Sequence, residues 1–338
     1  MSRFSGLFFK LFISTVLITS CGKTNDIIDV SDVQLSVPVM RLDQELFDKS
    51  EPMKTKLPQL TKEYGEFFAR YTEDMLNLGA IGDPTLPGAF KQFVYDTDIS
   101  KVAADVNSKY GDFSVEQKKI EVAFKRYKIL FPKKEVPTVV TIISGFTYKI
   151  AATQKTIGVG LDMYLGTDYP YYNALQFPAY RKNTLERKFI PSDVLTGWVS
   201  TEFVKPDSAN SMLDEIIHEG KILYLLDRMF PHLSDEIKIG YLPEQFKWCQ
   251  ENEMAMWGHF VNEKILFSRI KGDFFKFITD GPFTAGFDRA SPARTGNWIG
   301  WQIVRSYMES NPEITELELM NNTNAQGILN ASNYKPKK

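Results

Sequence analysis

The stretch "DEIIHEGKILYLLD", from Asp214 to Asp227, decides how the centre of this chain folds. Residues three and four apart share a helix face, and apolar residues occupy both sides of a helix drawn through the stretch. The pattern therefore predicts a helix that is largely buried. Charged side chains on such a helix must pair with one another or reach water. We expect Lys221 to approach either Asp214 or His218, in a polar network that also contains Glu215.

The five residues HEGKI at the centre of this helix match the metallopeptidase pattern H-E-x-x-H at every position except the last. In that pattern two histidines four residues apart bind one zinc ion, and the glutamate activates a metal-bound water. Here His218 and Glu219 occupy the first ligand position and the catalytic position. Ile222 replaces the second histidine and has no lone pair to donate. We therefore interpret His218 and Glu219 as vestigial catalytic residues, and we predict neither a bound metal nor another cofactor.

Two alternatives to this interpretation remain open. The chain has 3 histidines, and His259 lies four residues before Glu263, so that these two share a helical face. A zinc site of His218, His259 and Glu263 would make the protein an envelope metallopeptidase with unusual ligands. In the other alternative, the helix has no catalytic ancestor and His218 is a polar residue of the core.

Arg294 is the third member of the predicted polar network, beside Glu215 and Lys221. It lies in the segment PARTG, where proline and glycine indicate a turn. A fixed cation at this point either pairs with Glu219 or Glu215, or caps its own turn. The sequence leaves both arrangements open.

Residues 1–20 read as the signal peptide of a bacterial lipoprotein. Two basic residues open the segment, residues 11–19 are apolar, and Cys21 follows the small residue of a cleavage site. We expect cleavage before Cys21 and lipid attached to this cysteine, so that residues 21–32 tether the protein to a membrane. No acidic run follows the cysteine, which favours a position facing the periplasm.

Composition indicates a large globular body. Apolar residues make up 43% of the chain, with 25 Phe and 15 Tyr, which is enough to bury an extensive core. The formal net charge of -2 provides no basic field, so nucleic acid is excluded as a predicted partner. No segment after the signal peptide has about 18 consecutive apolar residues, so the sequence predicts no transmembrane helix.

The rest of the chain predicts an α+β fold that is mainly helical with a small mixed β-sheet. Residues 33–132 read as a helical part that opens with an edge strand, residues 136–166 as β, and residues 183–338 as mainly helical. In the β part, "PTVVTIIS" is a continuous apolar run, typical of a strand covered on both faces. "TIGVGLDMYLG", residues 156–166, alternates like a strand, and its glycines indicate that another backbone or a ligand approaches closely. We expect residues 33–338 to form one domain.

Six segments together carry a resemblance to a known family. They are "RLDQELFD" (41–48), "IGVGLDMYLGTDYPYY" (157–172), "IIHEGKILYLLD" (216–227), "NEMAMWGHFVNEKILFS" (252–268), "GPFTAGFDRASPARTGNWIGWQIVRSYMESNP" (281–312) and "NAQGILNASNY" (324–334). With the lipoprotein signal before them, they resemble the gliding-motility lipoprotein GldB family of Bacteroidetes. That family is similar to predicted zinc-dependent peptidases with a full H-E-x-x-H, so the resemblance implies a zincin-like core over residues 136–338. Such a core requires the helix 214–227 to lie under the strand 156–166.

The resemblance also implies a role in the cell envelope. The protein would be a lipid-anchored factor required for gliding motility, as a non-catalytic component or an assembly or stability factor of the gliding and type IX secretion machinery. Its partners would be the membrane lipid, through the acyl anchor, and other gliding or secretion proteins of the envelope. A groove left from the ancestral active site would bind a protein segment, for instance as a strand added along residues 156–166.

Overall fold

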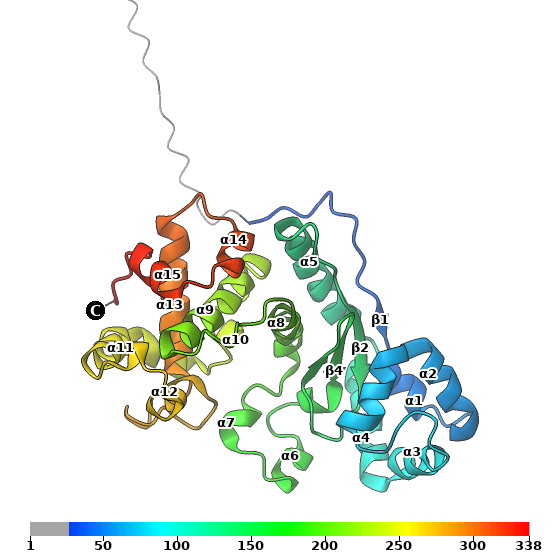
Figure 1. Ribbon diagram of the computed structural model, residues 1–338. Coiled ribbons are helices and arrows are strands. Elements are labelled where there is room, and N and C mark those ends of the chain that lie inside the picture. The colour runs from blue at the N-terminus through cyan, green and yellow to red at the C-terminus, as the bar shows by residue number, and fades with distance from the viewer. Residues whose placement is uncertain (1–26, 338) are drawn as a thin grey trace, which may run out of the picture.

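The computed structural model describes residues 27–337, and it places a small sheet between two groups of helices (Figure 1). The predicted fold class, α+β and mainly helical with a small mixed sheet, is confirmed. The predicted signal peptide and Cys21 lie outside the described residues, as does the tether up to residue 26. Within the described part, no helix is both long and apolar enough to cross a membrane.

The chain contacts the folded body soon after its described part begins. The guanidinium of Arg126 donates hydrogen bonds to the carbonyl oxygen of Ile28 at 3.3 Å and to that of Met229 at 2.8 Å. The predicted tether over residues 21–32 therefore joins the body before its expected end. This contact places the start of the described chain beside the end of the helix that contains His218.

The sheet has four strands in the order β1-β2-β4-β3. β1 (Val39–Met40) and β4 (Thr156–Gly160) both pair in parallel with β2 (Thr138–Ile142), and β3 (Ile150–Ala152) pairs antiparallel with β4. The predicted edge strand exists as β1, although it is only 2 residues long. Because β4 is paired on both sides, a partner strand cannot add along it, and that expectation is wrong.

β2 is buried on both faces, as its continuous apolar run predicts. Val139 belongs to a large core with Ile157, whereas Val140 and Ile142 belong to a second, smaller core. The smaller core is covered by α1 (Leu42–Phe47), α2 (Met53–Arg70), the π-helix η1 (Tyr71–Met75) and α3 (Leu86–Tyr95). α4 (Thr97–Tyr110) and α5 (Ser114–Leu130) contribute to the larger core. The helical character predicted for residues 33–132 is thus confirmed.

The strand predicted over residues 156–166 is too long. β4 ends at Gly160, and the chain continues as a short 3-10 helix, η2 (Leu161–Tyr164). The buried carboxylate of Asp162 accepts hydrogen bonds from the backbone N–H of Ser144 at 2.9 Å and from its hydroxyl at 3.0 Å. These bonds join η2 to the loop after β2, and they replace the ladder bonds that a longer strand would make.

The glycines of β4 mark close approaches by other parts of the chain, as expected from the sequence. A Cβ on Gly160 would lie 2.0 Å from the carbonyl oxygen of Tyr148, and one on Gly158 would lie 2.6 Å from the ring of Phe67. Of the two alternatives that the sequence left open, a protein neighbour and not a ligand fills the space. Only glycine permits such a distance between two backbones.

The second half of the chain is mainly helical. Its helices are α6 (Pro170–Ala174), α7 (Ala179–Lys182), η3 (Arg187–Phe189), α8 (Ile190–Glu202), α9 (Met212–Met229), α10 (Asp235–Ile239), α11 (Pro243–Asn262), η4 (Ile265–Phe267), α12 (Lys271–Ile278), α13 (Thr295–Ser310), α14 (Glu316–Asn321) and α15 (Ala325–Ala331). The predicted helix over residues 214–227 is therefore confirmed as the larger part of α9.

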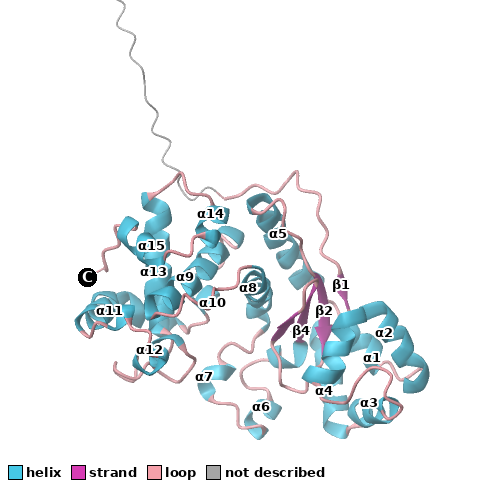
Figure 2. Ribbon diagram, viewed as in Figure 1, coloured by secondary structure: helices cyan, strands magenta, loops and turns pink. Residues whose placement is uncertain are grey.

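The helix that covers the sheet is α8, whereas α9 lies on the far side of α8 (Figure 2). Gly197 brings α8 close to the sheet, since a Cβ there would lie 2.6 Å from Ile150 and 3.2 Å from Ile157. The zincin-like core expected from the resemblance requires α9 to lie directly against β4. Within the described residues α9 does not lie there, because α8 packs against β3 and β4 instead.

α9 packs most closely against α13, through glycines on both helices. A Cβ on Gly220 would lie 2.4 Å from the backbone carbon of Gly300, and one on Gly300 would lie 1.7 Å from the carbonyl oxygen of Ile216. The two backbones therefore touch without intervening side chains. The third residue of HEGKI is thus a packing residue, and it holds α9 in the core.

Candidate functional site

The start of α9 is fixed by a reciprocal cap. The backbone N–H of Asp214 donates to the Ser211 hydroxyl oxygen at 3.2 Å, and the backbone N–H of Ser211 donates to the Asp214 carboxylate at 2.9 Å. This capping box satisfies two free N–H groups of the first turn. Because the carboxylate of Asp214 is engaged there, it does not form the ion pair with Lys221 that was one of the two expected arrangements.

Ile222 faces the core, at the position where the zinc pattern has its second histidine. Its side chain is 3% exposed and belongs to the large apolar core. His218, one turn earlier, lines a cleft that does not include Ile222. The two positions that would hold one metal ion therefore have different surroundings.

The alternative zinc site of His218, His259 and Glu263 does not form. The ring of His259 packs against the rings of Phe277 and Phe287, with centroids 5.5 and 5.2 Å apart. Over residues 27–337, no group of three histidine, cysteine, aspartate or glutamate side chains is arranged to hold a metal ion. Periodicity placed His259 and Glu263 on one helix face, but it could not show that the face meets an aromatic cluster.

Glu215, Lys221 and Arg294 do not form one network, in contrast to the expectation from the sequence. Glu215 pairs with Lys205 at 3.4 Å. Arg294 pairs with Asp280 at 2.9 Å and donates to the carbonyl oxygen of Ile239 at 2.9 Å. Neither of the two arrangements left open for Arg294 is observed. Its side chain pairs with neither Glu219 nor Glu215, and it makes no cap hydrogen bond at the start of α13.

Glu219 lies in the electrostatic field of Arg294, away from the cleft of His218. Burial raises the pKa of the Glu219 carboxyl, and the charge of Arg294 partly offsets that rise. Neither Glu219 nor Arg294 lines the cleft. The histidine and the glutamate of the sequence motif therefore do not act on one shared space.

The cleft beside His218 has a volume of about 210 Å³. It lies between the end of α8, the loop 203–209, the first half of α9 and the segment 320–325. Three lysines line it, Lys134, Lys205 and Lys221. Sequence reasoning missed Lys134, Lys205 and the segment 320–325, because nothing local signals that residues so far apart meet.

Two of these lysines have carboxylate partners, and Lys221 has none among the described residues. Lys134 pairs with Glu202 at 2.9 Å, and Lys205 pairs with Glu215. Lys221 is only 5% exposed, and its ammonium donates to the carbonyl oxygen of Asn322. Burial lowers the pKa of Lys221 to about 8.

The imidazole of His218 is neutral at physiological pH. Burial and, to a smaller extent, the positive charges of Lys221 and Lys205 together lower its pKa to about 4. Lys221 and His218 line the same cleft, but the ammonium of Lys221 donates to Asn322 O and makes no hydrogen bond to His218. The ammonium of Lys221, which has no carboxylate partner among the described residues, can bind an anion. The neutral imidazole of His218 cannot act as a general acid readily at neutral pH.

The fold and the cleft define a mainly helical α+β protein in which the HEGKI helix packs in the core and borders a cleft lined by three lysines. The sequence matches the family described as gliding motility protein GldB over residues 23–336, so the chain belongs to that family. Membership implies a lipoprotein of the cell envelope that takes part in gliding motility. No match is found among the curated proteins or among the solved structures.

Proposed function

We propose that the protein is a non-catalytic, lipid-anchored component of the gliding apparatus, which supports the assembly or stability of the gliding and type IX secretion machinery. The observation that carries this proposal is the burial of Ile222, 3% exposed in the core, at the position of the second zinc ligand. Family membership supplies the link to gliding motility. Its partners are the membrane lipid and other gliding or secretion proteins of the envelope.

The arrangement of His218 and Glu219 supports the non-catalytic role. Zinc hydrolysis needs three protein ligands, an open coordination position and a carboxylate that reaches the bound water. His218 lines the cleft, whereas Glu219 does not, and the other histidine of the alternative ligand set packs against phenylalanine rings. The non-catalytic role rests on the way α9 packs in the core, and it requires no zincin ancestor.

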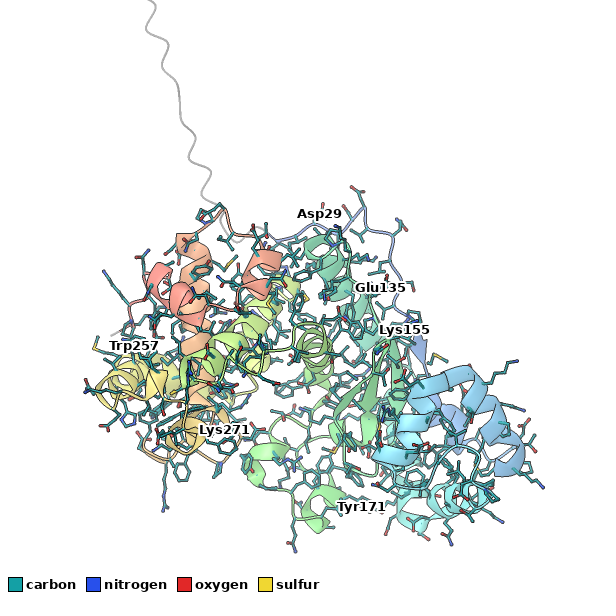
Figure 3. The ribbon with its side chains drawn as sticks, in the orientation of Figure 1. Asp29, Glu135, Lys155, Tyr171, Trp257 and Lys271 are labelled. Atoms are coloured by element: carbon teal, nitrogen blue, oxygen red, sulfur yellow. The ribbon has the colours of Figure 1, made fainter. Side chains whose placement is uncertain are left out.

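The proposed position in the cell rests on the expected lipidation of Cys21 and on the docking of the chain start. Lipid attached to Cys21 would hold the body at a membrane surface. Figure 3 shows Asp29 and Glu135 at the end of the molecule where the described chain begins, and Tyr171 at the opposite end. We propose that the body faces the periplasm, with the end that contains Asp29 nearest the membrane.

A complementation experiment tests the non-catalytic role. Cells that lack the protein receive either the wild-type chain or Glu219→Gln, which keeps the shape of the side chain and removes the carboxylate required for hydrolysis. We expect both to restore gliding on agar, with equal protein levels on immunoblots. Loss of gliding by Glu219→Gln at normal abundance would contradict the proposal and favour a peptidase.

Two controls complete this experiment. The first is Cys21→Ser, which removes the lipidation site, and for which we expect loss of the protein from the membrane fraction. The second is the metal content of the purified full-length protein beside His218→Ala. Near-stoichiometric zinc in the wild type that disappears in His218→Ala would support the peptidase with unusual ligands and overturn the proposal.

A further inference from the structure

We propose that the cleft beside His218 binds the free carboxylate at the C-terminus of a polypeptide, with Lys221 as its counter-charge and the apolar wall of the cleft against the last side chain. The inference deepens the proposed function, on which it rests, because it gives a chemical class to the segment that a partner protein offers. Cleft, charge and apolar lining each support it separately.

The charge of the cleft supports an anion. An ammonium buried without a carboxylate is unfavourable, and it either releases its proton or acquires a counter-charge. Lys221 has one backbone carbonyl acceptor, Asn322 O, for its three N–H groups. A ligand carboxylate would accept hydrogen bonds from the remaining donors and form an ion pair with the ammonium.

The other charges that face the cleft are already compensated. Lys134 pairs with Glu202, and Lys205 pairs with Glu215 and donates to the carbonyl oxygen of Ala209. The carboxylate of Asp214 belongs to the cap of α9. Lys221 is therefore the one lysine of the cleft without an ion pair among the described residues, and its single ammonium suits a single carboxylate.

The shape and lining of the cleft support a polypeptide end. The cleft holds about 210 Å³, which is below the range of roughly 300–1,000 Å³ of pockets for drug-sized molecules and suits one or two residues. Ile217 and Met320 offer apolar surface inside it, and Val204, 76% exposed, stands at its border. An extended chain can leave past Val204, while its terminal carboxylate points to Lys221. Capture of a terminal carboxylate is an established mode of peptide recognition.

Proton linkage gives the proposal a specific signature. A carboxylate bound next to Lys221 favours the ammonium form, so its binding is coupled to proton uptake when the pH exceeds the pKa of Lys221, about 8. His218 stays neutral at these pH values, since its pKa is lowered to about 4. The other charged groups that line the cleft are Lys134, Glu202, Lys205 and Asp214. We therefore expect affinity to fall as the pH rises above about 8.

The test measures binding of labelled pentapeptides to the full-length protein in detergent by fluorescence anisotropy. One probe, fluorescein-Gly-Gly-Ala-Val-Leu, has a free carboxylate, and its control has a C-terminal amide. We expect the acid to bind at least about tenfold more tightly than the amide, because hydrogen bonds to charged groups are strong when desolvated. Hexanoate serves as a competitor that has the carboxylate and the apolar chain without the peptide.

Two variants connect the binding to the cleft. Lys221→Met keeps the length and packing of the side chain, and we expect it to bind the acid at least about tenfold more weakly and to lose the preference over the amide. Val204→Asp changes an exposed side chain, so the fold should persist while the new charge repels the ligand. Lys247→Met is the matched control, because it removes a lysine of α11 whose side chain is 72% exposed. We expect this variant to bind the acid like the wild type.

Three results would overturn the inference. They are equal binding of acid and amide, wild-type affinity in Lys221→Met, and no saturable binding of the acid at millimolar concentration. Competition by hexanoate without binding of the pentapeptide would overturn the assignment to a polypeptide end, in favour of a small carboxylate. None of these results bears on gliding by Glu219→Gln, so failure of this inference is distinguishable from failure of the non-catalytic role.

Discussion

Substitution of Gly300 by alanine tests whether close packing of α13 on α9 holds the second half of the fold together. The new Cβ would lie 1.7 Å from the carbonyl oxygen of Ile216 and 3.0 Å from its Cβ. Carbon and oxygen atoms in contact are about 3.3 Å apart or more, so the helices must separate by roughly 1.5 Å. The clash involves backbone that cannot move independently of α9.

The expected loss of stability is larger than the intrinsic gain of alanine over glycine. Overpacking a core costs about 1–3 kcal/mol, occasionally more. A helical alanine is about 0.5–1 kcal/mol more favourable than glycine. Because the obstacle is backbone, we expect a net loss of about 2–3 kcal/mol or more, at the upper end of the overpacking range. For a body of this size that corresponds to a melting temperature lowered by roughly 3–5 °C.

Gly258→Ala provides the matched control for this substitution. Gly258 also lies inside a helix, α11, and a Cβ there would meet no atom within 4 Å. We expect Gly258→Ala to be slightly stabilising, by about 0.5–1 kcal/mol, in urea denaturation of the full-length protein followed by circular dichroism. A Gly300→Ala protein as stable as the wild type, or as stable as Gly258→Ala, would refute the packing argument.

Two further predictions concern the pH dependence of stability, each measured by urea denaturation of a variant beside the wild type. Burial lowers the pKa of Lys221 from 10.5 to about 8, so between these pH values the unfolded chain binds more protons and stability rises with pH. This rise, up to roughly 3 kcal/mol, should be absent from Lys221→Met, and equal slopes would contradict it. The pKa of His218 is lowered from 6.5 to about 4. The contribution of this neutral imidazole to the free energy of unfolding is therefore fully present above pH 6.5, and it is lost as the pH falls toward 4. His218→Gln should remove roughly 2–3 kcal/mol of this acid loss, and an unchanged acid profile would disprove the burial of a neutral imidazole.

The sequence predicts those elements whose cause is local. β2 is recognisable because a short continuous apolar run must be covered on both faces, and α9 because apolar residues recur on both of its sides. The length of β4 is different, since it depends on hydrogen bonds that Ser144, in the loop after β2, donates to the carboxylate of Asp162. No periodicity within residues 156–166 contains that information. The same limit applies to α8, whose place against the sheet depends on Gly197 fitting Ile150.

The candidate site was predictable only in part, for the same reason. His218 and Lys221 were identifiable from their types on a buried helix, where each needs a partner or a reason to be neutral. The partner of Lys221 is a backbone carbonyl at Asn322, more distant along the chain than any helix pattern reaches. Backbone acceptors are common to every residue, so their position cannot be read from composition or spacing. Lys205 was missed likewise, because its pairing with Glu215 requires the loop after α8 to fold back on α9.

The residues of HEGKI serve three separate purposes in this structure. Gly220 permits contact with Gly300, Ile222 fills the core, and His218 borders the cleft. A histidine at position 222 would complete the written pattern, yet it would place an imidazole among the apolar side chains of the core. The missing ligand is therefore not a single lost residue. Zinc binding would require α9 to rotate, and contact between Gly220 and Gly300 leaves no room for that rotation.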